Sequence, residues 1–365
     1  MRSVIDITDL GKEELERLMD KALDIIAHPA KYSHVCDGKK LATLFFEPST
    51  RTRLSFEAAM YELGGHVLSV TGAAQSSAAK GESVADTAKV VSYYADIIAI
   101  RHPKEGAAYV AAHNAAVPVI NAGDGGHCHP TQTLADILTI YREKGRFDGL
   151  TVGLCGDLKY GRTVHSLINF LSRYSGVRLV LISPEELRLP RYIIENTVKK
   201  CGMEYVETAS LEDSLPSLDV LYMTRIQRER FDDEAEYERL KGSYVLTPEK
   251  MDRAKEDTIV LHPLPRVDEI SVAVDADRRA CYFRQAENGK YMRMALILKL
   301  LEEKDAPDPR AAQSKEIVYG KYVCRNPKCI TSVERELAPK FVVSDGKPRC
   351  AYCEQSPTEK VTENK

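Results

Sequence analysis

Hydroxyl and guanidinium groups are crowded into residues 45–57, which read FFEPSTRTRLSFE. An apolar run ends here, and we expect the following helix to begin near Ser49 to Thr52, where its first backbone N–H groups have no partners within the helix. These N–H groups, the hydroxyls of Ser49, Thr50 and Thr52 and the guanidinium of Arg51 can together bind an oxyanion. The segment therefore predicts a phosphate cradle, and an ordinary helix cap with solvated arginines is the alternative.

Two more polar turns follow apolar runs in the first half of the chain. AIRHPKEG (99–106) sets Arg101 after one run, and NAGDGGHCHPTQTLADI (121–137) sets His129 and Gln132 after another. Because ligands of open α/β sheets bind outside the carboxyl ends of the strands, we expect these turns to converge. A guanidinium and an imidazole directed at one carbonyl oxygen would stabilise the negative charge that grows on it during attack. A single histidine is more often structural than catalytic, so this interpretation depends on the joint placement.

Charged side chains also follow the strands expected in the second half. GDLKYGRT (156–163) imitates a P-loop, but Arg162 replaces the lysine of that motif and is better suited to a carboxylate or phosphate on a small ligand. YMTRIQRERF (222–231) sets Arg225 and Gln227 at another strand end, in a segment that could equally be a solvated loop. In LHPLPR (261–266) the two prolines leave carbonyl groups without local N–H partners, and such carbonyls can accept hydrogen bonds from an attacking amine.

The segment SSAAKGESVADT (76–87) carries one lysine, Lys80, ahead of an expected helix. Its Ser, Ala and Gly content is typical of a flexible solvated loop, which is the interpretation that the segment alone favours. Loops of this kind can also close over a bound anion.

The nine cysteines fall into two groups, of which only the last four have the spacing of metal ligands. They form C-x4-C, twenty residues and then C-x2-C, which predicts a closed, structural zinc site in a reducing compartment. Residues 316–365 are too few for a core of their own, and a metal would supply the missing stability. The four predicted ligands are Cys324, Cys329, Cys350 and Cys353.

The elements that must position these residues alternate between short apolar runs and helical stretches. This alternation predicts parallel strands joined by helical crossovers, in two α/β units with a boundary near 145–150. In the helix after the cradle we expect Leu54, Ala58 and Tyr61 to share the buried face. The expected strands are KLATLFFE, HVLSV, DIIAI and VPVIN in the first unit and TVGLCGD, RLVLIS, DVLYMTR and TIVLHPLP in the second. The expected helices cover 52–63, 83–94, 105–114, 131–144, a stretch from about 162, 191–201 and 290–304.

The composition of the chain argues against some classes of binding partner. The 365 residues are 44% hydrophobic and carry a formal net charge of -3, so nothing drives the whole chain toward nucleic acid or an anionic membrane. No stretch is long and apolar enough to span a bilayer, and the N-terminal 26 residues resemble a folded amphipathic helix rather than a signal peptide. We therefore expect a cytoplasmic protein.

In this order, the motifs FFEPSTRTRLSFE, KGES, RHP, GDLKYGRTVHS, YMTRIQ and LHPLPRVDEI resemble the catalytic chain of the aspartate carbamoyltransferase family over about residues 1–305. The resemblance implies two doubly wound parallel-sheet domains and a homotrimer with shared active sites, and leaves a higher assembly open. The domains expected from it are a carbamoyl phosphate-binding domain (1–148), an aspartate-binding domain (149–288), a C-terminal helix packing back on the first domain (289–304), a linker (305–317) and a zinc domain (318–365).

Site residues follow from the same resemblance. It implies that Arg51, Thr52, Arg101 and His129 are catalytic and that no cofactor is needed for catalysis. It also implies that Arg162 faces the α-carboxylate of aspartate and that Arg225 faces its β-carboxylate. In this family Ser76 and Lys80 reach into the active site of a neighbouring subunit. The other substrate-binding residues that it implies are Ser49, Thr50, Gln132, Gln227 and the carbonyls of Leu264 and Pro265.

The last block, VYGKYVCRNPKCI…CAYCEQ, resembles a different chain, the zinc domain of the aspartate carbamoyltransferase regulatory chain. The nucleotide-binding domain that normally precedes it is missing, which puts control by nucleotides in doubt. Residues 318–365 carry nine Lys and Arg against six Asp and Glu, a formal charge of +3. Four thiolates on Zn²⁺ would lower this by about 2, so a nucleic-acid-binding zinc module is disfavoured.

The expected function is transfer of a carbamoyl group from carbamoyl phosphate to the amine of L-aspartate, the committed step of pyrimidine synthesis. An ornithine-type carbamoyltransferase is the alternative enzyme, but its usual HCLP turn reads HPLP here. A catalytically silent scaffold bearing zinc is the alternative outside catalysis, although such a scaffold should have lost Arg51, His129 or Arg162, and all three are present.

Overall fold

The computed structural model describes the chain except residues 73–76, 227–232, 308–315, 345 and 360–365. The chain forms two compact units, and each is described here by itself. The first unit combines Met1–Thr131 with Lys290–Lys365, and the second is Gln132–Gly289. Among the described residues no helix is both long and apolar enough to cross a membrane.

The first unit is built on a four-stranded parallel sheet with the strand order β2-β1-β3-β4. The two central strands are buried almost throughout, because helices cover both faces of the sheet. Register brings Phe45 beside Arg101 and His102 beside Asp124, so the carboxyl ends of β1, β3 and β4 lie along one edge. The strands are β1 Lys40–Phe45, β2 His66–Thr71, β3 Ile97–His102 and β4 Val119–Asp124.

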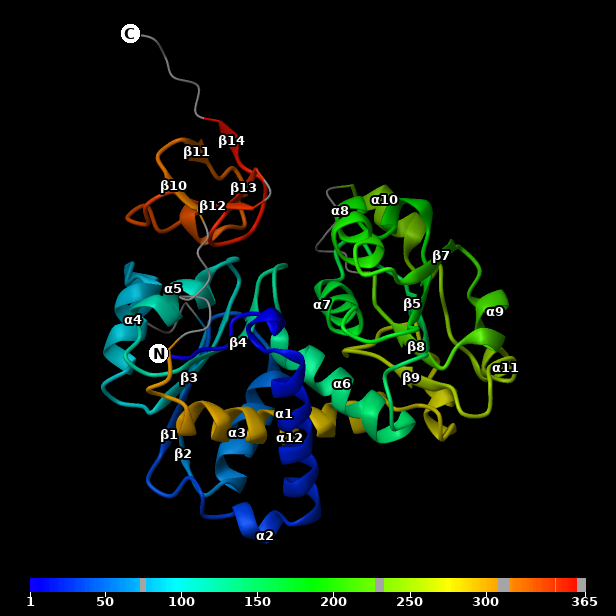
Figure 1. The fold of residues 1–365 in the computed structure, drawn as a ribbon, viewed down its shortest axis with the longest axis horizontal. Helices are drawn as coiled ribbons and strands as arrows, with labels where there is room; N and C mark the ends of the chain where they lie inside the picture. Colours follow the sequence, from blue (N-terminus) through cyan, green and yellow to red (C-terminus); the bar gives the residue numbers. More distant parts are fainter. Residues whose placement is uncertain (73–76, 227–232, 308–315, 345, 360–365) are drawn as a thin grey trace. The chain divides into compact units, whose positions relative to one another are not determined.

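The helices of the first unit lie on the two sides of this sheet, with α4 and α5 on one side and α1, α3 and α12 on the other (Figure 1). Helices α6 and α12 each contain a boundary between the two units. The helices are α1 Lys12–Ala27, α2 Pro29–Tyr32, α3 Thr50–Glu62, α4 Val84–Val91, α5 Ala107–Asn114, α6 Pro130–Lys144 and α12 Tyr282–Glu302.

The buried face of α3 differs from the predicted one. Leu54 and Tyr61 are 50% and 59% exposed in the isolated chain, and the buried side chains are instead Phe56, Ala59 and Met60. The spacing of apolar residues fits either face, and the guanidinium of Arg293 from α12 lies over the ring of Phe56, which selects that face. The expected burial of Leu54 and Tyr61 was therefore wrong for a single chain.

The second unit has a five-stranded parallel sheet with the order β7-β6-β5-β8-β9. Its strands are β5 Thr151–Cys155, β6 Arg178–Ile182, β7 Glu204–Thr208, β8 Val220–Met223 and β9 Ile259–Leu261. Its own helices are α7 Arg162–Leu171, α8 Arg191–Ile193 with a π-helical continuation over Ile194–Lys199, α9 Leu211–Ser214, α10 Glu234–Leu240 and α11 Pro248–Met251. The sequence analysis did not predict β7, α9, α10 or α11.

The C-terminal block belongs to the first unit and contains only short strands. Three of them form an antiparallel sheet in the order β10-β12-β13, and two form a separate pair. They are β10 Glu316–Tyr319, β11 Tyr322–Val323, β12 Lys340–Ser344, β13 Lys347–Cys350 and β14 Thr358–Glu359. Two doubly wound parallel-sheet domains and a small four-cysteine domain confirm the predicted fold class.

Candidate active site and metal centre

The predicted phosphate cradle lies at the start of α3, directly after β1. Ser49 is the N-cap residue with an extended backbone (φ -160°), and its hydroxyl makes no capping hydrogen bond to the helix. The side chains of Thr50 and Arg51 are exposed, and those of Ser49 and Thr52 are half-buried. A helix start whose cap hydroxyl is not used for capping has donors to spare for an anion.

Arg101 is the last residue but one of β3 and lies beside Phe45, the last residue of β1. Its Nη2 lies 2.7 Å from Oε2 of Glu47, and its Nη1 donates to the carbonyl of Ala122 at 3.3 Å. Its buried Nε has no hydrogen-bond partner among the residues that the structure describes. Burial lowers the pKa of Arg101, and Glu47 opposes this effect. The guanidinium is thus held from one side and keeps an unused donor.

Arg51 and Arg101 are close enough to repel one another. Burial lowers the pKa of Arg51, and the positive charge of Arg101 lowers it further. Two guanidinium groups beside a helix N-terminus destabilise each other's positive charge. An anion with two or more negative charges would relieve this repulsion. This pair is the strongest electrostatic sign of a phosphate site in the first unit.

The loop after β4 carries His129, and Asp124 fixes its shape. The buried carboxylate of Asp124 accepts hydrogen bonds from the side chain of Asn121 and from the backbone N–H groups of Gly106 and Cys128, at 2.8 to 3.0 Å. His129 is buried immediately before α6, and its Nδ1 lies 3.5 Å from Oγ1 of Thr131. Because β3 and β4 are parallel neighbours, Arg101 and the loop with His129 lie at the same edge of the sheet, as predicted.

Two predicted contacts fall outside the described residues, namely Ser76 and Gln227. Lys80 ends a short 3-10 helix, Ser77–Lys80, and its side chain is exposed. Gln132 lies in the first turn of α6 but belongs to the second unit, where its Nε2 donates to Oδ1 of Asp136 at 2.8 Å.

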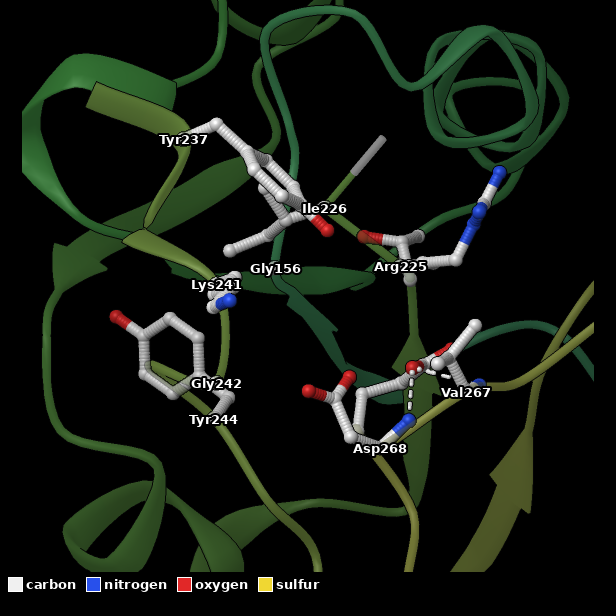
Figure 2. A pocket seen from close by; sticks show the side chains of 11 residues that line it. Gly156, Arg225, Ile226, Tyr237, Lys241, Gly242, Tyr244, Val267 and Asp268 are labelled. Carbon is white, nitrogen blue, oxygen red and sulfur yellow. Dashed lines mark hydrogen bonds between the residues drawn. The ribbon is translucent and has the colours of Figure 1, made fainter. Parts of the chain in front are cut away.

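The second unit has a pocket at the carboxyl ends of its strands, with a cavity of about 50 Å³. Arg225, which follows β8, is one of its lining residues, as are Tyr237, Lys241, Tyr244 and Asp268. Figure 2 shows Tyr237, Lys241 and Tyr244 on one side of the pocket and Arg225 and Asp268 on the other. The lining thus combines Arg225 and Lys241 with the carboxylates of Asp268 and Glu269, and the guanidinium of Arg225 is a group suited to a ligand carboxylate.

Arg162 is the first residue of α7, and the preceding Gly161 occupies the N-cap position. Its side chain is half-buried, and its backbone N–H donates to the carbonyl of Tyr160 at 2.9 Å. A guanidinium at a helix start, at the carboxyl edge of the sheet, is suited to a small anionic ligand, as the sequence indicated.

The turn with Leu264 and Pro265 is held by a buried histidine. Nδ1 of His262 accepts from the backbone N–H of Leu264 at 2.8 Å, and its Nε2 lies 2.7 Å from Oε1 of Glu269. Burial alone would raise the pKa of Glu269, but hydrogen bonds from His262 and from the backbone N–H of Val267 hold it at about 2. The ionised carboxylate fixes the ring, and the ring fixes the N–H of Leu264, which has a left-handed backbone (φ 51°).

The four cysteines predicted as metal ligands come together. All four Sγ atoms lie within 4.8 Å of one another, at 3.6 Å between Cys324 and Cys353 and 3.9 Å between Cys329 and Cys350. Four thiolates around a tetrahedral Zn²⁺ with bonds of about 2.3 Å would be about 3.8 Å apart. The cluster therefore has the donor set and spacing of a closed metal site without an open position.

Glu105 makes several of the contacts between the four-cysteine domain and the rest of the first unit. The backbone N–H of Glu105 donates to the carbonyl of Lys328 at 2.8 Å, its carbonyl accepts from Ile330 at 2.9 Å, and its carboxylate accepts from Asn326 at 2.7 Å. At the next residue, Gly106 (φ 87°), an added Cβ would lie 2.6 Å from Cβ of Tyr352. Ile330, Phe341 and Tyr352 of the cysteine domain share one apolar cluster with Ile98 and Ile100 of β3.

The sequence analysis did not predict four residues that shape the candidate site. Glu47 stands inside the quoted motif, and its position before a proline gave no sign that it would pair with Arg101. Asp136 lies one helical turn after Gln132, a spacing that could have predicted their contact. Of the remaining two, His262 stands inside the quoted LHPLPR motif, directly beside the turn that it holds, whereas Lys241 is distant in sequence from Arg225 in the same pocket.

Comparison with known families matches nearly the whole chain. Residues 2–142 match the aspartate/ornithine carbamoyltransferase, carbamoyl-P binding domain, and residues 148–300 match the Asp/Orn binding domain of the same family. Residues 316–363 match the aspartate carbamoyltransferase regulatory chain, metal binding domain.

Individual proteins agree with these matches. The aspartate carbamoyltransferase catalytic subunit of Lachnoclostridium phytofermentans is 60% identical over 301 residues, 82% of this chain and 98% of its own, and that of Clostridium novyi is 61% identical over 300 residues, again 82% and 98%. The solved catalytic subunit of M. jannaschii aspartate transcarbamoylase is 49% identical with a TM-score of 0.78, covering 84% of this chain and 100% of its own.

An aspartate transcarbamoylase from Trypanosoma cruzi, solved with carbamoyl phosphate and aspartate, is 38% identical with a TM-score of 0.77, covering 82% of this chain and 96% of its own. The alternative of a silent scaffold has no support among these relatives, which are named as enzymes. The chain is a transferase that belongs to the aspartate/ornithine carbamoyltransferase family, on its aspartate carbamoyltransferase branch, and it carries a C-terminal metal-binding domain of the regulatory-chain type.

Proposed function

We propose that the chain transfers the carbamoyl group of carbamoyl phosphate to the amine of L-aspartate, giving N-carbamoyl-L-aspartate and phosphate. The observation that carries this proposal is the pair of mutually repelling guanidinium groups, Arg51 and Arg101, beside the uncapped start of α3. That arrangement suits a dianionic phosphate ester or anhydride, and the family match narrows the ligand to carbamoyl phosphate.

In this reaction the neutral amine of aspartate attacks the carbonyl carbon, a C–N bond forms, and the bond from that carbon to the phosphate oxygen breaks. Arg101, His129 and Thr52 are assigned to the carbonyl oxygen, where they stabilise the developing negative charge. Ser49, Thr50 and Arg51 are assigned to the leaving phosphate, one of whose oxygens takes the amine proton. Orientation and charge stabilisation by the chain's own groups suffice, and no cofactor is assigned to catalysis.

The second unit is assigned to aspartate. Arg162 is assigned to the α-carboxylate, Arg225 and Gln227 to the β-carboxylate, and the carbonyls of Leu264 and Pro265 to the amine and to the carbamoyl NH2. The pocket beside Arg225 is lined by Lys241 and also by the carboxylates of Asp268 and Glu269, so its charges do not choose between an acidic and a cationic substrate. The named relatives, which are aspartate carbamoyltransferases, favour aspartate over ornithine.

The named relatives support the same substrates. The T. cruzi enzyme was solved with carbamoyl phosphate and aspartate and, separately, with N-(phosphonacetyl)-L-aspartate, and it is 38–39% identical to this chain. We retain the expected domain boundaries, 1–148, 149–288, 289–304, 305–317 and 318–365, as part of the proposal. The first of these domains is assigned to carbamoyl phosphate and the second to aspartate.

A homotrimer with shared active sites is also part of the proposal. Leu54 and Tyr61 on α3 and Leu68 on the edge strand β2 are exposed in the single chain, and apolar side chains of this size suit a subunit interface. Ser76 and Lys80 are assigned to the active site of the neighbouring subunit.

We assign Zn²⁺ to the four-cysteine cluster, in a structural role. The separations of 3.6 and 3.9 Å between sulfur atoms fit tetrahedral zinc, and four thiolates leave no site for a substrate. Thiolate ligands require a reducing compartment, which supports a cytoplasmic location. Metal analysis of the purified protein should give one zinc per chain, and iron or no metal would contradict the assignment.

The proposed reaction is tested by incubating the purified chain with carbamoyl phosphate and either L-aspartate or L-ornithine. N-carbamoyl-L-aspartate should form with one phosphate per product, and ornithine should not be converted. Citrulline formation would instead assign the chain to the ornithine branch of the family.

A further inference from the structure

Asp136 is a completely buried carboxylate in the second unit, on α6. Its Oδ1 accepts from Nε2 of Gln132 at 2.8 Å and from Nε2 of Gln285 at 2.6 Å, and its Oδ2 accepts from the hydroxyl of Tyr222 at 3.1 Å. Burial and the charge of Asp136 raise the pKa of Tyr222, so its hydroxyl stays a donor. A buried charge is costly unless paired, and these three donors compensate for the water that Asp136 has lost.

The carboxylate determines how the amide of Gln132 is turned. An ionised carboxylate only accepts hydrogen bonds, so the amide must present its NH2 to Asp136 and its carbonyl oxygen elsewhere. The reverse orientation would place two acceptors against each other in a buried environment, which is strongly disfavoured. Gln132 is half-buried, so its Oε1 remains available as an acceptor for a ligand.

The same carboxylate also orients Gln285. With Nε2 of Gln285 donating to Asp136, its Oε1 accepts from the backbone N–H of His262 at 2.9 Å. His262 in turn accepts from the N–H of Leu264. A continuous chain of hydrogen bonds therefore joins Gln132 to the turn of Leu264 and Pro265 within the second unit, with Asp136 at its centre.

We propose that Asp136 is a positioning residue for the carbamoyl nitrogen: it holds the Gln132 carbonyl oxygen, and through Gln285 the Leu264 turn, as hydrogen-bond acceptors for the carbamoyl NH2. This rests on the proposed function, in which the Leu264 carbonyl contacts the carbamoyl NH2, and it assigns Gln132, an expected substrate-binding residue, to the same NH2. The carbamoyl NH2 is a donor, whereas the methyl group of acetyl phosphate is not. Asp136 therefore contributes to the choice of carbamoyl over acetyl phosphate.

The test compares the KM for carbamoyl phosphate with the inhibition constant of acetyl phosphate in Asp136→Asn. An asparagine can present either its oxygen or its NH2, so the amide of Gln132 is free to turn over. We expect the KM for carbamoyl phosphate to rise about tenfold, the cost of one misdirected hydrogen bond, and the inhibition constant of acetyl phosphate to stay within about twofold. Equal weakening of both ligands would mean a merely structural role and would overturn the proposal.

Thr139→Val is the matched control. Thr139 lies one turn further along α6 and accepts from Nδ2 of Asn288 on α12 at 2.9 Å, so its loss removes a buried polar link between the same two helices without touching Gln132. This variant should leave the ratio of the two constants unchanged. A shift in that ratio as large as in Asp136→Asn would show that any loosening of these helices has the effect, which overturns the proposal.

If Asp136→Asn does not fold, Gln132→Ala tests the proposal instead. This variant should fold, because Gln132 is half-buried and lies in the first turn of α6. It should lose the preference for carbamoyl over acetyl phosphate by at least as much as Asp136→Asn, and full retention of the preference would overturn the proposal. In the double variant that combines Gln132→Ala with Asp136→Asn, the change at Asp136 should reduce the preference for carbamoyl over acetyl phosphate by less than it does in the single variant. A wild-type chain without carbamoyl transfer would overturn the proposed function instead, so the two failures are distinguishable.

Discussion

The guanidinium of Arg101 and the carboxylate of Glu47 lie 2.7 Å apart at the carboxyl edge of the first sheet. Glu47 pairs with Nη2 of the guanidinium, and Nε of Arg101 is buried without a hydrogen-bond partner in the described part of the chain. The pair thus fixes the direction of Arg101 while keeping a donor for the substrate. Such prior orientation is what a group that stabilises a transition state requires.

Arg101→Lys should lower kcat/KM by about 10²-fold, although the charge is kept. A lysine has a single nitrogen and cannot contact both Glu47 and a carbonyl oxygen in the fixed geometry of a guanidinium. Steady-state kinetics with both substrates measures this loss, and the melting temperature is the control for folding. Near wild-type kcat/KM in this variant would contradict the role assigned to Arg101.

Arg51→Ala and His129→Ala should both lose activity, the first mainly through a higher KM and the second mainly through a lower kcat. Arg51 is exposed at the cradle and assigned to phosphate, so its loss should mainly raise the KM for carbamoyl phosphate. His129 is assigned to the carbonyl oxygen, so its loss should lower kcat by about 10²-fold or more. If His129→Ala has wild-type kcat, the imidazole does not stabilise the oxyanion.

Lys80→Ala chains mixed with Arg51→Ala chains should regain part of the activity that each lacks alone. In a trimer with shared sites, some sites of the hybrids would combine an intact Arg51 with an intact Lys80 from the neighbour. Lys80 is exposed at the end of a short 3-10 helix, so its removal should not disturb the fold. Absence of complementation in mixtures with proven subunit exchange would show that each site is built from one chain.

Loss of zinc should destabilise the protein more than it impairs turnover. Cys324→Ser removes one of four ligands, and the cysteine domain shares an apolar cluster with β3 through Ile330, Phe341 and Tyr352. The variant should lose zinc and melt several degrees lower, while a chain truncated after residue 312 keeps aspartate-dependent turnover in whatever trimer survives. An unchanged melting temperature in the zinc-free variant would contradict a structural role.

The imidazole of His102 should stay neutral at pH values well below 6.5, the ordinary pKa of histidine. Burial lowers its pKa from 6.5 to about 4, against opposing effects of the N–H of Lys104 and the carboxylate of Asp124. Because the folded-state pKa lies below the unfolded value, this group contributes stability above pH 6.5 that is lost as pH falls toward 4. NMR titration of histidine-labelled protein, with His102→Gln to assign the signal, should show this pKa, and a value near 6.5 would contradict the buried environment.

Much of the site could be predicted because its residues stand at the ends of recognisable strands. Parallel strands bring their carboxyl ends to one edge, so the cradle, Arg101 and the His129 loop were placed together from local sequence alone. The cysteine spacing predicted the metal cluster in the same way, since each pair of ligands sits in one tight turn. In both cases the residues that predict the site stand close together in the sequence.

The rest of the fold could not be predicted, because it depends on contacts between residues that are distant in the sequence. Helix α12 begins at Tyr282, before the predicted start at 290. Buried hydrogen bonds from Gln285 to Asp136 and from Asn288 to Thr139 stabilise this first part of the helix. The strand β7, EYVET, is a sheet edge with exposed glutamate, so its pattern lacked the continuous apolar run of its neighbours.

Carbamoyl transfer to aspartate is tested most directly with isotope-labelled carbamoyl phosphate and the purified full-length chain. The label should appear in N-carbamoyl-L-aspartate, one phosphate should be released for each product, and Arg51→Ala should nearly abolish this transfer at low carbamoyl phosphate. Transfer of the label to ornithine, or no transfer to aspartate by a folded protein containing zinc, would contradict the proposed function.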